Sequence, residues 1–517
     1  MRAPESRRPA PRRNHLSDSP ARRVSGVSGL SCVRAAGRYN GAMRTASHAL
    51  PALILTFACL GLAACRSGSS GAQKSTSTTG DAGPPVDGAS SGSPTLDKAS
   101  VARDQAVPAD VSIAVDANNA FAIALYSEVS PAANGGNFLT SPLSATLALT
   151  MTYAGARGTT ATQMATALHI PSSGPSIFDA QNALSQALDG RAAAALAADK
   201  QRSEGSGSAP SSSDYQMQVV NSVWGQKGYP WATGFLATLA ASYGTGVYVE
   251  DFTTNSAGAE SAINNWVSDE TSGKINPLLS PGDITPDTRM VLVNAIHVKL
   301  PWENPFDATQ TAPATFTRGD GSTVQPSFMN QTFTSDGSQG AIGYAQTADG
   351  QFLSLPLAGS QVSVVFALPA KDLPTLTGSL TKDSFTVPAT GSIVVLKLPK
   401  FTFTSQTFSL AKSLQALGMT QAFDPVNADF KGMCAATPDG DNLYISDVLQ
   451  KAMLDVAENG VEAAAATAVV MAGAGIAGPT PPTITLTFDH PFIVSIVDSS
   501  GAILFLGQID DPTASGS

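Results

Sequence analysis

From about residue 111 onward the hydrophobic pattern changes its period repeatedly, which predicts helices interspersed with long strands. Apolar residues recur at helical spacing in 117–130, 145–156, 159–170, 178–196, 235–243, 257–271 and 410–419. Alternating or continuous apolar runs, typical of strands, occupy 216–224, 247–252, 290–299, 394–403, 486–490, 491–497 and 503–507. The pattern therefore predicts an α+β fold.

One segment, 445–476, carries a pattern that fits two structures. Residues 448–457 alternate as a strand does, and Glu458–Gly460 is prone to form a turn. The run 461–471 contains four consecutive alanines, which favour a helix. Its small and β-branched residues are also compatible with a strand buried on both faces. A surface segment that can also become a central strand indicates two conformational states.

The N-terminal part has the features of an export signal rather than of a domain. Residues 1–42 are rich in Arg, Ser and Pro, and we interpret them as a basic leader or as a start assigned upstream of the true one at Met43. In 43–65 an apolar run too short for a membrane span ends in Leu-Ala-Ala-Cys, which resembles a bacterial lipobox. We expect a signal peptide there, with Cys65 as a lipid anchor on the periplasmic or outer side of a membrane; an ordinary signal peptide is the alternative.

The remaining boundaries follow from composition. Residues 66–110 are rich in small polar residues and predict a flexible tether, 111–512 the folded domain, and 513–517 a C-terminal tail. The net charge of −10 without a basic cluster argues against a nucleic-acid partner. Three of the four cysteines precede the domain, so we expect no disulfide framework, and Cys434 is interpreted as a structural thiol.

The residues of the predicted domain contain no recognisable catalytic constellation. Its histidines, His169, His297 and His490, lack metal-ligand spacing and are interpreted as structural. Ser409 and Lys412 fit a Ser-x-x-Lys pattern, but the companion motifs of the penicillin-recognising hydrolases are missing. We therefore expect neither an enzyme nor a metal or cofactor site.

Several segments resemble the serpin family of protease inhibitors. The hinge of an inhibitory serpin's reactive-centre loop is matched by Glu458, Gly460, Val461, Glu462, Ala463, Ala464, Ala465, Ala466 and Thr467. Residues 451–456 resemble the fifth strand of the family's main sheet, and 290–299 with Trp302 resemble the third strand and the "breach" tryptophan. The family's "shutter" is resembled by Ser141, Ser144, Asn294 and Gln450. The C-terminal pattern also matches, so the resemblance runs in order from about 111 to 512.

The resemblance implies a fold and a mechanism. The fold would place several helices on a large mixed central sheet, with two smaller sheets and an exposed loop. The mechanism would be suicide-substrate inhibition by a monomer, in which a serine protease, or a cysteine protease, cleaves the loop and is trapped as the loop inserts into the sheet. Two residues depart from the family pattern. Val461 replaces a Thr or Ser, which insertion should tolerate, and Gln450 replaces a shutter histidine, so we expect its amide to bond toward Asn294.

The family's spacing places the cleaved bond between Ala474 and Gly475, with Met471 and Ile476 left open because the loop is longer than usual. The chain has no Lys or Arg from residue 452 to its end, which disfavours trypsin-like targets. Elastase-, subtilisin- or chymotrypsin-like proteases are expected instead. The alternatives are a non-inhibitory serpin-fold protein that binds a partner or is only a protease substrate, and a lipoprotein hydrolase.

Overall fold

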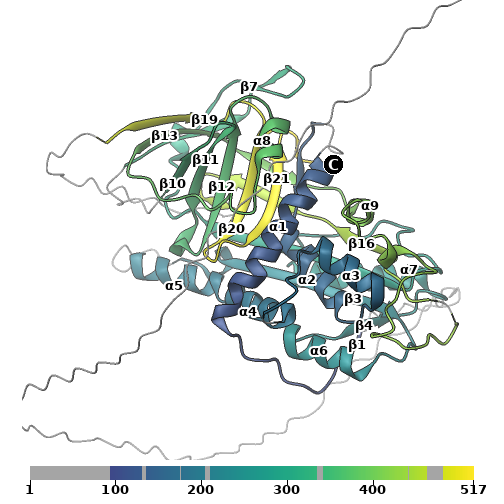
Figure 1. Cartoon of the computed structure of the whole chain (residues 1–517). Coiled ribbons are helices and arrows are strands. Elements are labelled where there is room, and N and C mark those ends of the chain that lie inside the picture. The colour runs from purple at the N-terminus through teal and green to yellow at the C-terminus, as the bar shows by residue number, and fades with distance from the viewer. Residues whose placement is uncertain are drawn as a thin grey trace, which may run out of the picture. The chain divides into compact units, whose positions relative to one another are not determined.

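The structure is a computed structural model that describes residues 94–130, 135–174, 176–203, 210–334, 342–440, 442–462 and 481–516. All of these residues belong to a compact unit that spans Asp87–Ser517. The predicted leader, the signal peptide with Cys65 and most of the tether lie outside the described residues. The unit consists of helices packed on several β-sheets (Figure 1).

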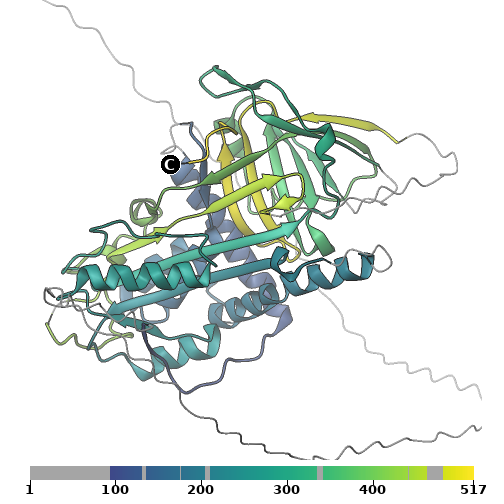
Figure 2. The same ribbon diagram turned by 180° about the vertical axis from the view of Figure 1, so that it is seen from behind.

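The largest sheet has nine strands and is organised around β5 (Met290–Pro301), which is buried along nearly its whole length. On one side, β5 pairs antiparallel with β3 (Gln216–Gln226). The sheet continues from there through β4 (Val247–Glu250) to β1 (Thr95–Asp97). The other side of β5 faces the C-terminal strands β14 (Phe401–Thr404), β15 (Phe408–Ser409), β16 (Asp447–Gln450), β17 (Met453–Ala457) and β18 (Gly460–Val461). Figure 2 shows the molecule from behind, turned by 180° from the view of Figure 1.

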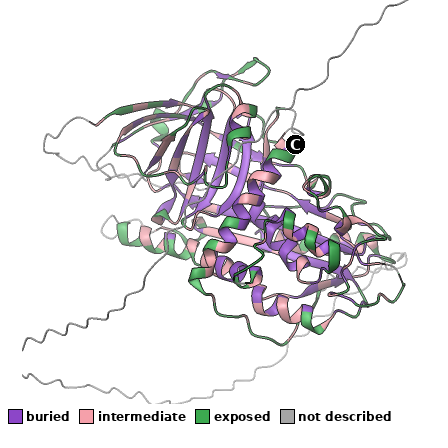
Figure 3. Ribbon diagram, viewed as in Figure 1, coloured by how far each residue is buried: buried purple, intermediate pink, exposed green. Residues whose placement is uncertain are grey.

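Smaller sheets complete the architecture. A six-stranded sheet follows the order β10 (Gly343–Gln346), β11 (Gly350–Pro356), β12 (Val362–Pro369), β20 (Phe492–Asp498), β21 (Ile503–Ile509) and β2 (Phe138–Thr140). A four-stranded sheet contains β19 (Thr483–Thr487), β13 (Ile393–Pro399), β9 (Ser327–Phe333) and β6 (Ala312–Pro313), and β7 (Phe316–Thr317) pairs with β8 (Thr323–Val324). Strands β20 and β21 are buried at every position, as their continuous apolar runs predict (Figure 3).

The helices are α1 (Val111–Val129), α2 (Pro142–Tyr153), α3 (Gly158–Ala167), α4 (Ile177–Asp189), α5 (Arg191–Ser203), α6 (Thr233–Tyr243), α7 (Ser256–Glu270), α8 (Leu373–Ser379) and α9 (Ala411–Ala416). Helix α2 is apolar or small on all sides and is almost entirely buried. Its start follows the local sequence, because Ser141 caps it and Pro142 occupies the first turn. Within the described residues no helix has the length and hydrophobicity of a membrane span.

The two faces of the largest sheet are covered differently. Even-numbered β5 residues such as Ile296 and Val298 pack into the main core, which the smaller sheets share. Odd-numbered residues such as Val293 and Ala295 pack against α7 and the connection that follows it. Both faces of β5 are therefore buried, which explains its continuous apolar sequence.

The structure corrects several boundaries that the sequence predicted. The helix expected over 178–196 is divided into α4 and α5 near Gly190. The strand expected over 448–457 is divided into β16 and β17. Strands β9 to β12 were missed, because their apolar positions are interrupted by turns at short intervals.

The predicted tether extends too far along the chain. Residues 94–110 pack on the domain, and β1 pairs antiparallel with β4 from Thr95↔Val249 to Asp97↔Val247. Arg103 Nε donates to Asn182 Oδ1 of α4 at 3.0 Å. The folded unit therefore begins before residue 111, and a short polar segment without strong periodicity adds an edge strand to the largest sheet.

Candidate functional site: the hinge and the sheet seam

The feature that distinguishes this sheet is the line between β5 and the β16–β17 strands, here named the seam. At one end of the seam β16 pairs parallel with β5, from Asp447↔Val291 to Gln450↔Asn294. At the other end β18 pairs antiparallel with β5, at Gly460↔Pro301 and Val461↔Leu300. Among the described residues, 295–299 of β5 pair with β3 on one side and with no strand on the other. We name this part the open stretch of the seam.

The open stretch exists because the strand before the hinge changes partner. After Gln450 the chain leaves β5, and β17 pairs with β14 instead. The change of direction is held at Ala452, whose N–H donates to Ser405 Oγ and whose carbonyl accepts from the Ser405 N–H. These two bonds satisfy the backbone groups that a continuous ladder would otherwise use.

Two residues of the predicted hinge, Gly460 and Val461, lie inside the sheet. The turn at Glu458 and Asn459 reverses the chain, and β18 enters between β17 and β5. Val461 is only 1% exposed and belongs to the main core. Gly460 has a φ of +149°, and a Cβ there would lie 2.3 Å from the carbonyl oxygen of Leu300. Only glycine fits this position, which explains the residue in physical terms.

Trp302 closes the sheet beside the hinge. Its indole Nε1 donates to the Ala457 carbonyl at 2.8 Å, and its backbone N–H donates to the Asn459 carbonyl at 2.9 Å. The ring is 2% exposed and meets Phe306 edge-on, with centroids 6.1 Å apart. The structure thus places this residue at the predicted breach, in contact with the turn that begins the hinge.

Glu458 is fixed at the same place by a cation and a hydroxyl. Lys400 Nζ lies 2.7 Å from Glu458 Oε2, and Thr311 Oγ1 donates to Glu458 Oε1 at 2.9 Å. Partial burial opposes ionisation, but the bonds from Lys400 and Thr311 outweigh it and lower the pKa of the Glu458 carboxyl. The Glu458 carboxyl is therefore ionised, and its bonds to Lys400 and Thr311 hold the turn in place.

Glu462 ends the inserted part of the hinge. Its backbone N–H donates to the Asp455 carbonyl at 3.1 Å, but its φ of +50° departs from the strand conformation. Its carboxylate accepts from His297 Nε2 of β5 at 2.5 Å and lies 3.3 Å from Lys274 Nζ. Burial raises the pKa of this carboxyl, and the His297 bond and Lys274 charge reverse the effect, so that the pKa is lowered.

The closed end of the seam carries the predicted shutter residues. Gln450 is 1% exposed, and its Oε1 accepts from Thr140 Oγ1 at 2.6 Å and from the Ser141 N–H at 2.9 Å. Its Nε2 donates to the Ser141 carbonyl at 2.9 Å. The side chain therefore joins β16 to the start of α2, and this bridge replaces the bond toward Asn294 that we expected.

The remaining shutter residues divide between two surroundings. Ser141 Oγ donates to the Leu504 carbonyl at 2.8 Å, and Ser144 Oγ lies 2.6 Å from the side-chain amide of Asn221. Asn294 is fully buried, and its Nδ2 has no hydrogen-bond partner among the described residues. The serines thus fasten α2 to neighbouring strands, whereas Asn294 pairs with Gln450 in the β5–β16 ladder.

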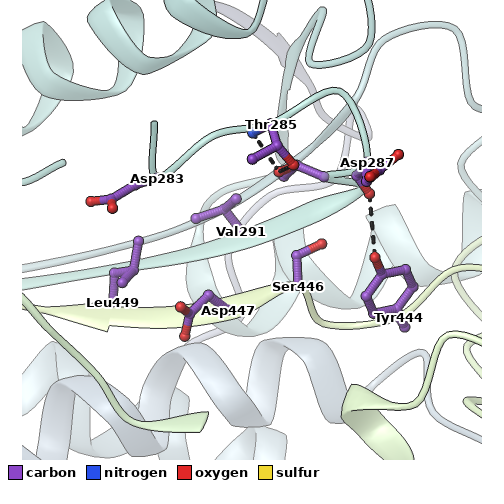
Figure 4. Close-up of a pocket in the computed structure, with 9 residues that line it drawn as sticks. Asp283, Thr285, Asp287, Val291, Tyr444, Ser446, Asp447 and Leu449 are labelled. Atoms are coloured by element: carbon purple, nitrogen blue, oxygen red, sulfur yellow. Dashed lines mark hydrogen bonds between the residues drawn. The ribbon is translucent and has the colours of Figure 1, made fainter. Parts of the chain in front are cut away.

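A pocket of about 210 Å³ lies at the closed end of the seam, away from the hinge (Figure 4). Its lining includes Val291 and Asp447, which form the last pair between β5 and β16. Tyr444 Oη donates to the Asp287 carbonyl at 3.3 Å across one side of it. The lining contributes three aspartates, and the pocket lies beside the end of the β5–β16 ladder that is farther from the hinge.

Some predicted site residues lie outside the described part of the chain: Ala463, Ala464, Ala465, Ala466, Thr467, Met471, Ala474, Gly475, Ile476 and Cys65. Sequence reasoning also missed residues that the structure brings to the hinge. Lys400 was seen only as part of a strand, and His297 only as a structural histidine. Their roles depend on strand register, for which a single sequence carries no signal.

Comparisons with known proteins agree with this geometry. Residues 116–512 match the family described as serpin (serine protease inhibitor). The chain therefore belongs to the serpin family. It is 33% identical over 410 residues to an uncharacterized serpin-like protein of Thermococcus kodakarensis, covering 77% of this chain and 85% of that protein. It is 30% identical over 410 residues to the human leukocyte elastase inhibitor, covering 77% of this chain and 98% of the inhibitor.

Solved structures give the same result for the fold. The native-state crystal structure of the thermophilic serpin tengpin superposes with a TM-score of 0.66 at 27% identity, over 81% of this chain and 100% of tengpin. Helices packed on a large mixed sheet with additional smaller sheets are thus confirmed as the fold class.

Proposed function

We propose that this protein is a suicide-substrate inhibitor of serine endopeptidases, and that the residues after Glu462 form the strand that inserts. The observation that carries the proposal is the seam, where β18 pairs with β5 and where, among the described residues, the adjoining stretch of β5 pairs only with β3. Its relatives include proteins named as inhibitors of leukocyte elastase and of plasminogen activator, which supports protease inhibition in general.

The chemistry would belong to the protease. Its serine oxygen attacks the carbonyl of the loop residue before the cleaved bond, the peptide C–N bond breaks, and the new amine takes a proton from the protease's histidine. An ester then joins the protease to the N-terminal part of the loop. Insertion of that part as a strand displaces the attached protease before water hydrolyses the ester. The inhibitor contributes no catalytic group, and the outcome depends on how fast its loop inserts relative to hydrolysis of the ester.

The register of β18 predicts the position of every inserted residue. Extending Val461↔Leu300 antiparallel along β5 pairs Thr467 with Asn294, and extending Val461↔Val456 along β17 pairs Thr467 with Gln450. Asn294 and Gln450 are themselves paired where the seam closes. Residues 462–466 would therefore fill the open stretch, and only from Thr467 onward would the entering strand have to separate β16 from β5.

The sequence of the entering segment suits this path. Odd-numbered residues would point into the main core as Val461 does, and these are Ala463, Ala465 and Thr467. They are small, so that they can follow Val461 without displacing β5 or β17. The N–H and C=O groups of 295–299 that point away from β3 would gain ladder bonds, which would supply part of the driving force.

The proposed targets are proteases with uncharged specificity pockets. The first test incubates the purified chain with an elastase-like and a subtilisin-like protease and separates the products on a denaturing gel. A covalent band near the summed mass is expected, and mass spectrometry of the released C-terminal peptide would locate the cleaved bond. Complete cleavage without a complex, over several proteases and ratios, would instead indicate a substrate or a binding protein.

A variant tests where the bond lies. Ala474→Arg should shift inhibition toward trypsin, because the trypsin pocket requires a cation. Ile476→Arg is the matched control and should leave trypsin uninhibited. If only the control variant inhibited trypsin, the bond would follow Ile476 and not Ala474.

We also propose that the protein is exported and anchored through Cys65, as its lipobox-like sequence indicates. A labelled fatty acid should be incorporated into the protein expressed in a bacterial host, and Cys65→Ala should abolish incorporation. Equal labelling of both forms would contradict the anchor.

A further inference from the structure

The geometry points to a further inference, which rests on the proposed function. We propose that Glu462, His297 and Lys274 form a clamp that arrests the entering strand after Val461, so that Glu462 is a positioning residue for insertion. The clamp holds the hinge partly inserted until the loop is cleaved, and it must open before the next residues can enter.

The arrest follows from the position of the Glu462 carboxylate along β5. In the extended register Glu462 would pair with Lys299, and Ala464 would pair with His297. In the structure the Glu462 side chain instead reaches His297, one pleat further along the same face. It therefore occupies the level at which the inserted strand would place Ala464.

The backbone of Glu462 supports the same conclusion. Its φ of +50° is a left-handed conformation that costs a residue with a Cβ energy, and no strand can continue through it. Entry of the following residues requires φ to return to the extended region, and that rotation moves the carboxylate away from His297. The strain and the hydrogen bond are thus parts of one two-state element.

Lys274 links the clamp to the segment that covers the seam. It belongs to the connection between α7 and β5, whose Ile275 and Leu278 pack in the cluster that includes Val293 of β5 and Leu449 of β16. Lys451, where the seam opens, donates to the Pro277 carbonyl at 2.9 Å. This connection therefore spans the seam from one strand to the other, and the Lys274–Glu462 ion pair fastens the hinge to it.

Several polar atoms in and beside the clamp lack a hydrogen-bond partner among the described residues, which fits an arrest that must be reversible. The buried atoms Glu462 Oε1, His297 Nδ1 and Gln218 Oε1 have no hydrogen-bond partner among the described residues. Gln218 is the β3 partner of His297 in the ladder. A fully satisfied network would hold the hinge more tightly, whereas these unpaired atoms reduce the cost of opening.

The experiment compares the full chain with Glu462→Gln, His297→Phe and the double variant. Each single substitution should lower the unfolding midpoint of the uncleaved protein, and the double variant should lose less than the sum, because both remove the same bond. Conversion of the uncleaved protein to a form that resists unfolding should become about tenfold faster, the factor that corresponds to 1.4 kcal/mol. Glu128→Gln, an exposed glutamate of α1, is the matched control.

A second readout separates positioning from general stabilisation. In the form cleaved within 471–476, the clamp would already be open, so Glu462→Gln should leave the unfolding midpoint of that form unchanged. Substitution of a residue with a purely structural role would lower the unfolding midpoints of both the uncleaved and the cleaved form. Lys274→Met, with a side chain 41% exposed, gives a milder variant that keeps the test valid if His297→Phe does not fold.

The outcomes also separate this inference from the proposed function. Three results would overturn the clamp, whatever the protein does to proteases. They are additive losses of stability in the double variant, an unchanged unfolding midpoint of uncleaved Glu462→Gln, and slower conversion of that variant to the form that resists unfolding. If cleavage of the wild-type chain fails to raise its unfolding midpoint, insertion and with it the proposed function are wrong. Coupling between Glu462 and His297 in the uncleaved chain would then still show the contact, but not an arrest, and the clamp would be rejected.

Discussion

The two ends of the seam are closed by different kinds of interaction. At the hinge, strand β18 is held by an ion pair between Glu458 and Lys400, by the clamp at Glu462 and by the indole of Trp302. At the shutter, Gln450 is held by neutral hydrogen bonds in a fully buried setting. The hinge end therefore responds to charge, salt and acid, whereas the shutter end responds to loss of buried hydrogen bonds.

This difference suits an ordered opening. The lysines of the hinge ion pairs, Lys400 and Lys274, are partly exposed, so solvent can replace these pairs at small cost, whereas the Glu462–His297 contact is buried. The shutter contacts can be replaced only when water reaches the core, so breaking them is cooperative and expensive. In the proposed insertion, a strand that enters from the hinge would therefore meet its larger barrier at the shutter, after residues 462–466 had found partners.

The largest effect is expected from Val461→Arg. Val461 is 1% exposed in the main core, so the variant must bury an unpaired cation, at a cost of several kcal/mol, or expel the hinge. Complex formation on a denaturing gel should be lost, with the loop cleaved as a substrate. Val461→Thr should keep the covalent band. If Val461→Thr also lost the band, the position would be sensitive to any substitution and not specifically to charge.

Gln450→Leu tests the shutter. The substitution leaves the backbone groups of Ser141 and the Thr140 hydroxyl without their partner, and we expect a loss of about 3 kcal/mol in the free energy of unfolding by urea. Gln415→Leu, on the exposed face of α9, should change it by less than about 0.5 kcal/mol. Equal effects of the two variants would mean that the shutter bonds do not stabilise the sheet.

Gly460→Ala tests the backbone of the hinge. An added Cβ would meet the Leu300 carbonyl and an unfavourable φ, so we expect a loss of about 2 kcal/mol and a hinge displaced from the sheet. Hydrogen exchange should show the Val461 amide losing protection while the Gln450 amide keeps it. Gly378→Ala in α8, where a Cβ meets no atom within 4 Å, is the control.

Lys400→Met separates the two ends by their response to salt. The ion pair with Glu458 is partly exposed, so its removal should cost only about 0.5 to 1 kcal/mol, and the loss should shrink in 1 M salt. The loss in Gln450→Leu should be the same at both salt concentrations. A salt-independent loss in Lys400→Met would show that the contact acts through packing of the lysine stem.

The smallest expected effect concerns acid. The pKa values of Glu458 and Glu462 are lowered in the folded state from their usual 4.5, the second through His297 of β5 and Lys274 beyond α7. The unfolded chain therefore binds more protons, and the stability that these carboxylates contribute above pH 4.5 is lost as pH falls through their folded values. Unfolding of wild type and of a Glu458→Gln, Glu462→Gln double variant should converge in acid; parallel curves would contradict this.

The sequence by itself determined the elements that meet at the seam. The apolar run of β5, the capped helix after Ser141 and the turn at Glu458–Gly460 all follow from local patterns, which act over a few residues. The run of small residues after the hinge turn can also be read from the sequence, and the proposed insertion would need it. These patterns predicted an α+β fold, and the resemblance to serpins predicted its arrangement.

Only the tertiary structure decided how far the hinge enters and what holds it there. The pair of His297 and Glu462 joins residues 165 positions apart, and its existence depends on the register of β18 against β5. A shift by one residue would turn Val461 out of the core and separate the pair. Strand register is set by packing of the whole sheet, and therefore neither the open stretch, the Gln450 bridge to α2 nor the role of Lys400 could be predicted from the sequence.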